Sequence, residues 1–261
     1  MPAYDDDLRL AHVLADAADS VTMQRFRQRD LEVETKSDQT PVSDADRTTE
    51  EQIRGTLRRA RPRDAVHGEE GEDTGYGPRR WVIDPIDGTK SYVRGVPVWA
   101  TLIALMDGDA VVAGVVSAPA LGRRWWAATG SGAFTGKSLS AATRIAVSRI
   151  DTLADASLSF SSLRGWEVEG REEGFTRLCR LVSRQRAYGD FWSYMLVAEG
   201  AVDVACEPQV ALHDLAALDV IVTEAGGRLT DLDGHPGPSG GSAVATNGLL
   251  HEAALSALAK D

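Results

Sequence analysis

Residues 81–89 read Trp81-Val82-Ile83-Asp84-Pro85-Ile86-Asp87-Gly88-Thr89, and this is the most informative stretch of the sequence. The apolar residues at its start predict a buried strand that ends at Asp84. Pro85 then fixes the backbone of a turn, which brings a second carboxylate, Asp87, back beside the first. Because carboxylate oxygens are hard ligands, two of them facing one point predict a site for a cation such as Mg²⁺.

Other residues of this turn add neutral groups to the predicted site. The turn leaves the carbonyl oxygen of Ile86 available as a further metal ligand. If Gly88 and Thr89 open a helix, their backbone N–H groups can donate hydrogen bonds to a phosphate oxygen. The same letters also describe an ordinary Asp-Pro-x-Asp-Gly turn, so the motif needs support from elsewhere in the chain.

Two further acidic segments supply that support. Glu69 follows the short apolar pair Ala65-Val66, which places it at the end of a predicted strand. Asp214 begins a predicted helix of small apolar residues. Each segment also has a simpler interpretation: Glu69 and Glu70 suit a solvated acidic loop, and Asp214 suits an ordinary acidic residue at a helix N-terminus.

Composition limits the classes of partner. A formal net charge of -11 argues against binding to nucleic acid, because that requires a basic face which displaces counterions from phosphates. A phosphorylated substrate is still compatible with this charge, since metal ions can lie between its phosphate and the carboxylates. With 261 residues, 43% of them hydrophobic, the chain can bury a large core as one domain or as two packed halves.

The sequence also gives an expectation about location. Three consecutive acids, Asp5, Asp6 and Asp7, lie near the start, where a secretory or transit signal would be basic and apolar. No segment has the apolar length of a membrane span. The two cysteines, Cys179 and Cys206, have no partners at zinc-ligand spacing and suit a reducing compartment. We therefore expect a cytoplasmic protein without a membrane or nucleic-acid partner.

Hydrophobic periodicity divides the chain into two parts. The first part has predicted helices over 5–26 and 46–59, a half-exposed strand over 31–35, and a β-rich region over 81–134 with a hairpin turn at 107–109. After about residue 148, strands and helices alternate. The strands there are predicted over 156–160, 202–206, 228–230 and 242–246, and the helices over 174–183, 191–199, 214–225 and 250–259. We expect an N-terminal α+β half over residues 1–145 and a C-terminal α/β half over residues 146–261.

Taken together, the acidic segments resemble the inositol monophosphatase superfamily of lithium-sensitive, magnesium-dependent phosphatases. Residues 81–89 match the superfamily pattern W-x-[IV]-D-P-[IL]-D-G-T. The order and spacing of the other matching segments also agree: Gly68-Glu69-Glu70 before it, and His213-Asp214-Leu215-Ala216-Ala217 and Val222-Thr223-Glu224-Ala225-Gly226-Gly227 after it. The resemblance implies a five-layered αβαβα sandwich, a homodimer, and two or three Mg²⁺ ions in each active site.

The resemblance also implies roles for individual residues. It makes Glu69, Asp84 and the Ile86 carbonyl ligands of one Mg²⁺, and Asp84, Asp87 and Asp214 ligands of a second. Asp46 and Thr89 join Glu69 as catalytic residues, with Thr89 hydrogen-bonded to Asp46 and helping Glu69 to orient the attacking water. Gly88, Thr89 and Lys36 are expected near the substrate. One position departs from the superfamily pattern, because His213 replaces the usual Trp before Asp214, and we expect His213 to be a wall residue.

Within the superfamily, the sequence is most similar to the histidinol-phosphate phosphatases of bacterial histidine biosynthesis. The residues that carry this similarity lie in the segments 87–99, 116–126 and 187–191. By position, Asp190 and Glu207 are expected to line the pocket for the organic part of the substrate. Asp190 offers a negative charge that suits a cationic substrate, although an Asp before a predicted helix is also a common cap. Inositol 1-phosphate is the alternative substrate, and fructose 1,6-bisphosphate and phosphoadenosine nucleotides are weaker alternatives.

Two other classes of protein compete with this interpretation. Phosphatases of the haloacid-dehalogenase type have an Asp-x-Asp-Gly-Thr motif, but one residue separates their acids, whereas Pro85 and Ile86 both separate the acids here. A catalytically silent protein that binds metal and phosphate for regulation is the other alternative. Against it, every position expected to bind metal keeps a suitable oxygen ligand.

Overall fold

Two β-sheets organise the computed structural model, which describes residues 4–36 and 40–260. The larger sheet has seven strands in the order β3-β4-β5-β6-β7-β8-β9, and all its neighbours are antiparallel except β3 and β4. The strands are β3 (Ala65–Gly68), β4 (Arg79–Asp87), β5 (Ala100–Asp107), β6 (Ala110–Ala118), β7 (Arg123–Ala128), β8 (Gly132–Gly136) and β9 (Ala142–Ile145).

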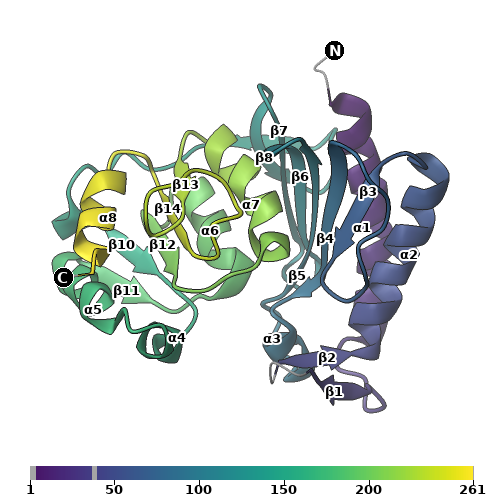
Figure 1. Ribbon diagram of the computed structural model, residues 1–261, viewed down its shortest axis with the longest axis horizontal. Coiled ribbons are helices and arrows are strands. Elements are labelled where there is room, and N and C mark those ends of the chain that lie inside the picture. Colours follow the sequence, from purple (N-terminus) through teal and green to yellow (C-terminus); the bar gives the residue numbers. More distant parts are fainter. Residues whose placement is uncertain (1–3, 37–39, 261) are drawn as a thin grey trace.

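The smaller sheet has five strands in the order β11-β10-β12-β14-β13. Strand β10 is parallel to β11 and β12, and β14 is antiparallel to β12 and β13. The strands are β10 (Ser157–Ser159), β11 (Arg184–Arg186), β12 (Val204–Glu207), β13 (Arg228–Thr230) and β14 (Ala243–Thr246). A separate pair, β1 (Val33–Thr35) and β2 (Pro41–Ser43), lies below the first sheet in Figure 1.

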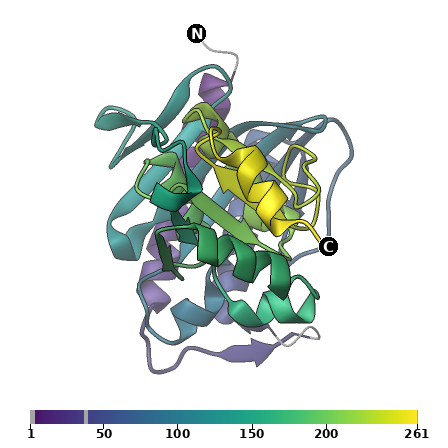
Figure 2. The same ribbon diagram turned by 90° about the vertical axis from the view of Figure 1, so that its left-hand side faces the viewer.

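Helices cover both sheets and fill the space between them (Figure 1). Helices α1 (Asp5–Arg25) and α2 (Asp44–Ala60) cover the outer face of the larger sheet, and α6 (Asp190–Ala198) and α7 (Leu212–Glu224) lie between the sheets. The outer layer on the smaller sheet, which faces the reader in Figure 2, contains α4 (Leu163–Val168), α5 (Glu172–Leu181) and the yellow α8 (His251–Leu258). Short helices at Thr89–Val93 (α3), Pro119–Leu121 (η1) and Leu153–Asp155 (η2) connect the layers. The expected five-layered αβαβα sandwich is therefore confirmed.

Side-chain alternation explains why the larger sheet is covered on both faces. In β4, Trp81 and Ile83 join the core beneath α1 and α2, whereas Val82 joins the core shared with α6 and α7. Small residues let the middle layer approach closely: a Cβ atom on Gly114 of β6 would lie 2.7 Å from Val220 Cγ1 and 2.9 Å from the carbonyl oxygen of Ala217. This tight contact holds α7, and therefore its N-terminus, at a defined height above the sheet.

Most predicted elements agree with the structure, with one informative correction. We expected the strand at residues 81–83 to end at Asp84, but β4 continues through Asp87. Asp84 pairs with Leu102 and Asp87 with Ala100, so two residues of β4 oppose the single residue Thr101 as a β-bulge. The bulge falls where Pro85 has no N–H to give to the ladder, and Thr101 Oγ1 instead donates to the Pro85 carbonyl at 2.8 Å.

The boundary between the predicted halves can be compared with the sheets. The larger sheet ends at Ile145 and the smaller one begins at Ser157. Helix α7 follows this boundary in the chain but packs against the larger sheet, so the division at residue 145 stays a prediction. Strands β2, β9 and β11 and helix α4 were not predicted from the sequence. Among the described residues, no helix combines the length and apolar character that a bilayer crossing requires.

His251, the first residue of α8, ties that helix to the smaller sheet. Its side chain is fully buried, with Nε2 3.0 Å from Thr230 Oγ1 and Nδ1 3.0 Å from Thr246 Oγ1. The Thr230 hydroxyl donates to the Asp231 carbonyl, so its oxygen accepts a hydrogen bond from Nε2–H, and Nδ1 accepts one from Thr246. Burial lowers the pKa of His251 to about 4, which favours this neutral form.

We expect the buried His251 to make the folded state sensitive to acid. Between pH 6.5 and pH 4 the unfolded chain binds a proton at residue 251 that the folded chain excludes, so stability falls as the pH falls through this window. From pH 7 to pH 5, wild-type protein should lose about 2 kcal/mol more of its unfolding free energy than His251→Asn. Urea unfolding of both proteins at each pH measures this difference, and parallel losses would show that folding does not lower the pKa of His251.

Candidate active site

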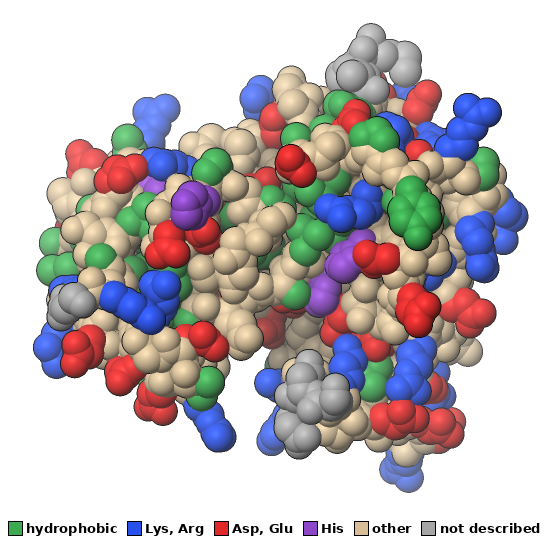
Figure 3. Space-filling view, viewed as in Figure 1, with side chains coloured by type: hydrophobic (Ala, Val, Ile, Leu, Met, Phe, Trp, Pro, Cys, Tyr) green, Lys and Arg blue, Asp and Glu red, His purple; other side chains and the backbone are tan. Residues whose placement is uncertain are grey.

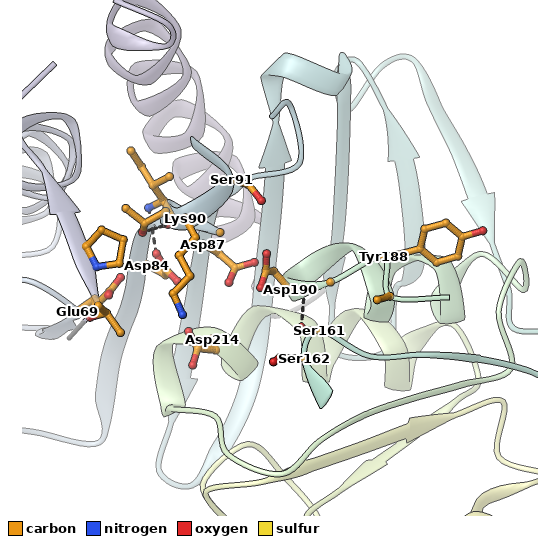
Figure 4. A pocket seen from close by; sticks show the side chains of 17 residues that line it. Glu69, Asp84, Asp87, Lys90, Ser91, Ser161, Ser162, Tyr188, Asp190 and Asp214 are labelled. Carbon is orange, nitrogen blue, oxygen red and sulfur yellow. Dashed lines mark hydrogen bonds between the residues drawn. The ribbon is translucent and has the colours of Figure 1, made fainter. Parts of the chain in front are cut away.

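A cavity of about 480 Å³ opens where β4 ends, between the larger sheet and the N-termini of α6 and α7. Figure 4 shows the side chains that line it, with Asp84 and Asp87 from β4, Asp214 from α7, and Asp190 from α6 pointing toward one another. In Figure 3 the surface is hollowed between the parts built on the two sheets, and Lys and Arg are interspersed with Asp and Glu on that face. The elements that carry the sequence motifs therefore meet at one place.

Three of the predicted metal ligands form a compact cluster. One oxygen from each of Asp84, Asp87 and Asp214 lies within 4.8 Å of the other two. Asp84 and Asp87 share a side of β4 because of the bulge between them, since residues three apart in a regular strand point to opposite faces. Asp214 stands in the first turn of α7, where Ala211 N–H donates to its Oδ2 at 2.7 Å.

The cluster concentrates negative charge in a buried place. Burial is the main reason why the pKa of Asp84 lies well above its ordinary value, and the neighbouring Glu69, Asp87 and Asp214 raise it further. Burial also raises the pKa of Asp87, followed by the charges of Asp190 and Asp214. Within the described ranges, no salt bridge joins Asp84 or Asp87 to a basic side chain. A divalent cation fits this donor set, because hard oxygen ligands with uncompensated charge are what Mg²⁺ and similar ions bind.

Glu69 lines the same cavity but stands beside this cluster. Its backbone N–H donates to the Ile83 carbonyl of β4 at 3.2 Å, while its Oε1 accepts from Lys36 Nζ at 2.7 Å. Lys36 Nζ also lies 2.6 Å from Glu70 Oε1. Burial would lower the pKa of Lys36, but its hydrogen bonds to the two carboxylates outweigh that effect and raise the pKa. Lys36, expected near the substrate, is thus bound to the acidic loop.

Thr89, Asp46 and Ile86 meet on the other side of Asp84. Thr89 Oγ1 lies 2.9 Å from the Ile86 carbonyl oxygen and 3.3 Å from Asp46 Oδ1, as the predicted contact between Thr89 and Asp46 requires. Asp46 Oδ2 accepts from Ser43 N–H at 2.8 Å and from its hydroxyl at 2.5 Å. Burial raises the pKa of Asp46 to about 6. The carbonyl of Ile86 keeps a second lone pair for a metal ligand bond.

Gly88 directly precedes the short helix α3 as its N-cap and has a left-handed backbone, with φ of 85°. A Cβ atom there would lie 3.0 Å from the Val98 carbonyl oxygen and 3.2 Å from Asp190 Oδ2. Glycine is therefore required both by the left-handed backbone and by the lack of room for a side chain. The N–H groups of Thr89 and Lys90 precede the first hydrogen bond of the helix, which Ser91 N–H donates to the Gly88 carbonyl at 2.8 Å. They line the cavity beside the acidic cluster, where a phosphate oxygen can accept from them.

Asp190 has an unusual backbone, because its φ of 49° is rare for a residue other than glycine. Its N–H donates to Ser161 Oγ at 2.8 Å, while the next N–H, of Phe191, donates to Asp87 Oδ2 at 2.7 Å. The first two N–H groups of α6 therefore both bind side chains, and that of Phe191 binds a residue of the acidic cluster. Burial raises the pKa of Asp190, and the charge of Asp214 adds to this effect.

Glu207 lines a second recess, of about 180 Å³, that adjoins the first through Asp87, Asp190 and Asp214. Its Oε1 accepts from Ser161 N–H, and burial raises its pKa to about 8. Tyr194 also lines this recess, and its hydroxyl has no partner among the described residues. The predicted substrate-binding acids thus lie on one side of the cluster and the groups of α2 and α3 on the other.

Sequence reasoning missed several residues of these cavities. Ser161 forms hydrogen bonds with both Asp190 and Glu207, and Tyr194 lines the smaller recess, but neither Ser161 nor Tyr194 belongs to a motif that the sequence displays. His213, expected to be a wall residue, stacks on His67 with ring centroids 6.1 Å apart and is not among the residues that line the larger cavity. Its Nε2 lies 3.7 Å from Asp214 Oδ1, behind the cluster.

Comparisons with known proteins agree with this geometry. The model of the inositol monophosphatase family matches residues 4–261. A histidinol-phosphatase of Streptomyces coelicolor is 65% identical over 98% of this chain and 97% of its own, and one of Mycobacterium tuberculosis is 60% identical over 97% and 98%. The solved structure of an inositol monophosphatase from Zymomonas mobilis superposes with a TM-score of 0.87 at 33% identity, over 99% of both chains.

The buried acidic cluster leads to a prediction about stability. In buffer with chelator, Asp84→Asn should melt at a higher temperature than wild type, because Asn keeps the contact of Oδ1 with Ile86 N–H but removes one of the repelling charges. Added Mg²⁺ should raise the melting temperature of wild type and have little effect on the variant.

Differential scanning calorimetry measures both shifts, and about 2–4 °C corresponds to roughly 1 kcal/mol for a protein of this size. Asp151→Asn, an exposed acid far from the cluster in sequence, is the control. An Asp84→Asn protein that Mg²⁺ stabilises as strongly as wild type would contradict the proposed metal site.

Proposed function

The chain is a phosphatase of the inositol monophosphatase family, and we propose that it hydrolyses histidinol phosphate to histidinol and phosphate with Mg²⁺ as its cofactor. We choose this substrate because the sequence is similar to the two histidinol-phosphatases along nearly the whole chain. The acidic recess beside the cluster supports the same choice. A cytoplasmic homodimer that Li⁺ inhibits is part of the proposal.

We assign the metal ligands as the sequence predicts. Glu69, Asp84 and the Ile86 carbonyl would hold one Mg²⁺, and Asp84, Asp87 and Asp214 a second, with room left for a third. When bound, these ions supply an acidified water and neutralise charge on the phosphoryl oxygens.

The other groups of the site are assigned to the phosphate and to the attacking water. The N–H groups of Gly88 and Thr89 bind a phosphate oxygen at the N-terminus of α3. Thr89 and Glu69 orient the water, and Thr89 Oγ1 would accept a proton from this water while it donates its own proton to Asp46 Oδ1, 3.3 Å away.

Charge supports a cationic organic group. Histidinol phosphate carries an ammonium group and a titratable imidazole, whereas an inositol ring is neutral. Asp190 and Glu207 both face the recess beside the phosphate site, and both are buried enough that a cation would stabilise their ionised forms. Tyr194 adds an unpaired hydroxyl to the same wall, which suits a ring nitrogen.

A direct comparison of substrates tests the proposal. We expect the value of kcat/KM for histidinol phosphate to exceed that for inositol 1-phosphate by at least about tenfold, equivalent to one charge-assisted hydrogen bond of roughly 1.4 kcal/mol. Release of inorganic phosphate in the presence of Mg²⁺ measures both rates. Preference for inositol 1-phosphate would favour the alternative substrate while leaving the phosphatase assignment unchanged.

Asp190→Asn separates recognition of charge from a purely structural role. Asn tolerates the left-handed backbone that residue 190 adopts, so the variant changes the charge and little else. The loss in kcat/KM for histidinol phosphate should correspond to about 1–3 kcal/mol, with little loss for inositol 1-phosphate. Equal losses of kcat/KM for both substrates would mean that Asp190 has a structural role and does not bind the cationic group of histidinol phosphate.

A further inference from the structure

Two glycines flank the acidic pair Glu69 and Glu70, and their backbone does not explain them. Neither Gly68 nor Gly71 has a positive φ, so left-handed conformation is not the reason for glycine. A Cβ atom on Gly68 would lie 2.3 Å from Glu50 Oε1 and 2.7 Å from Arg54 Nη2. A Cβ atom on Gly71 would lie 2.9 Å from the same Glu50 oxygen. The carboxylate of Glu50, on α2, therefore leaves no room for a side chain at either position.

That carboxylate is built into the acidic loop. The side chain of Glu50 is 3% exposed. Its Oε2 accepts from Glu70 N–H at 2.8 Å, and its Oε1 accepts from Gly71 N–H at 2.9 Å. Arg54, one turn further along α2, donates from Nε to Glu50 Oε1 at 2.6 Å and from Nη2 to the Gly71 carbonyl at 3.1 Å. The buried charge of Glu50 thus has a cation and two backbone donors as partners, as a buried carboxylate requires.

The loop needs such a restraint because its own charges repel the rest of the site. Glu69 raises the pKa of Asp84, which means that the two carboxylates destabilise each other in the absence of a cation. On the side of β4, the Glu69 N–H is held by the Ile83 carbonyl. On the other side, Glu50 holds the next two N–H groups of the chain. The backbone on both sides of Glu69 is therefore fixed independently of any metal ion.

We propose that Glu50, supported by Arg54, is a positioning residue that fixes the backbone after Glu69 and so holds the Glu69 side chain toward the cavity before Mg²⁺ binds. It contacts neither the cavity nor the acidic cluster and acts only through the backbone of residues 70 and 71. Gly68 and Gly71 are glycines so that this carboxylate can reach the backbone. Pre-organising the loop lowers the ordering cost of metal binding. The part concerning Mg²⁺ rests on the proposed function, whereas the part concerning the loop does not.

Hydrogen exchange in the metal-free, full-length protein tests the loop. The Glu70 and Gly71 amides should exchange slowly in wild type, and at least about tenfold faster in Glu50→Gln, which keeps the size of the side chain but loses its charge. Glu51→Gln is the matched control, because Glu51 is the next residue of α2 and is exposed. Unchanged exchange at Glu70 and Gly71 in Glu50→Gln would overturn the proposal.

Calorimetric titration with Mg²⁺ tests the consequence for the metal. Affinity should fall on the order of 10–100-fold in Glu50→Gln and stay unchanged in Glu51→Gln, while kcat at saturating Mg²⁺ remains close to wild type. A variant that only melts at a lower temperature, with wild-type affinity for Mg²⁺, would make Glu50 a structural residue and refute the inference. Wild-type protein that binds no Mg²⁺ would instead refute the proposed function, and the exchange experiment would still decide the role of Glu50 in the loop.

Gly71→Ala disturbs the same contact by changing the loop and leaving Glu50 in place. It therefore tests the proposal even if Glu50 variants do not fold. The added methyl group would meet Glu50 Oε1 and Arg54 Nε, at 3.2 Å, without removing either residue. We expect it to speed exchange at the loop amides and weaken Mg²⁺ binding in the same direction as Glu50→Gln. Wild-type exchange and affinity in Gly71→Ala would contradict the proposal.

Discussion

Repulsion among buried carboxylates is the constraint on which the rest of this structure depends. Asp84, Asp87 and Asp214 place their oxygens within 4.8 Å of one another in a setting where burial already disfavours charge. Such a cluster persists only if the surrounding backbone holds each carboxylate in place. The bulge in β4 holds the first two, and backbone N–H groups of Phe191 and Ala211 hold Asp87 and Asp214. Backbone N–H groups of the fold therefore stabilise carboxylates that would otherwise repel one another.

The five layers explain how these donors reach one point. Helices α6 and α7 are packed between two sheets, so their N-termini are fixed relative to the end of β4. The Gly114 contact with Ala217 and Val220 sets the distance of α7 from the larger sheet. Each N-terminus then presents N–H groups and the positive end of its helix dipole toward the carboxylates. Stability of the core and geometry of the site are linked, because loosening the middle layer would move Asp214.

The two sides of the cluster serve different purposes. Toward α2 and α3, Thr89, Asp46 and the Ile86 carbonyl form hydrogen bonds suited to handling a proton and a phosphate oxygen. Toward α6 and β12, Asp190 and Glu207 place their carboxyl groups in a separate recess, and Ser161 forms a hydrogen bond with each residue. In the proposed function, the phosphate side is built from backbone and motif residues, so a change on the recess side would alter substrate choice without disturbing the chemistry. The proposal thereby fits a family whose named members include both a histidinol-phosphatase and an inositol monophosphatase.

The sequence by itself determined the chemical class and most of the elements, because hydrophobic periodicity and the motif at residues 81–89 are local properties of the chain. It also placed Glu69, Asp84, Asp87 and Asp214 among the acids that line one cavity. Only the tertiary structure decided that β4 continues through a bulge, since that depends on how Thr101 of β5 pairs with residues 85 and 86. It likewise brought Ser161 and Glu50 into contact with site residues that lie 20 or more positions away in the chain. Contacts of that kind leave no periodic pattern in the sequence, because they depend on how separate layers come to pack against one another.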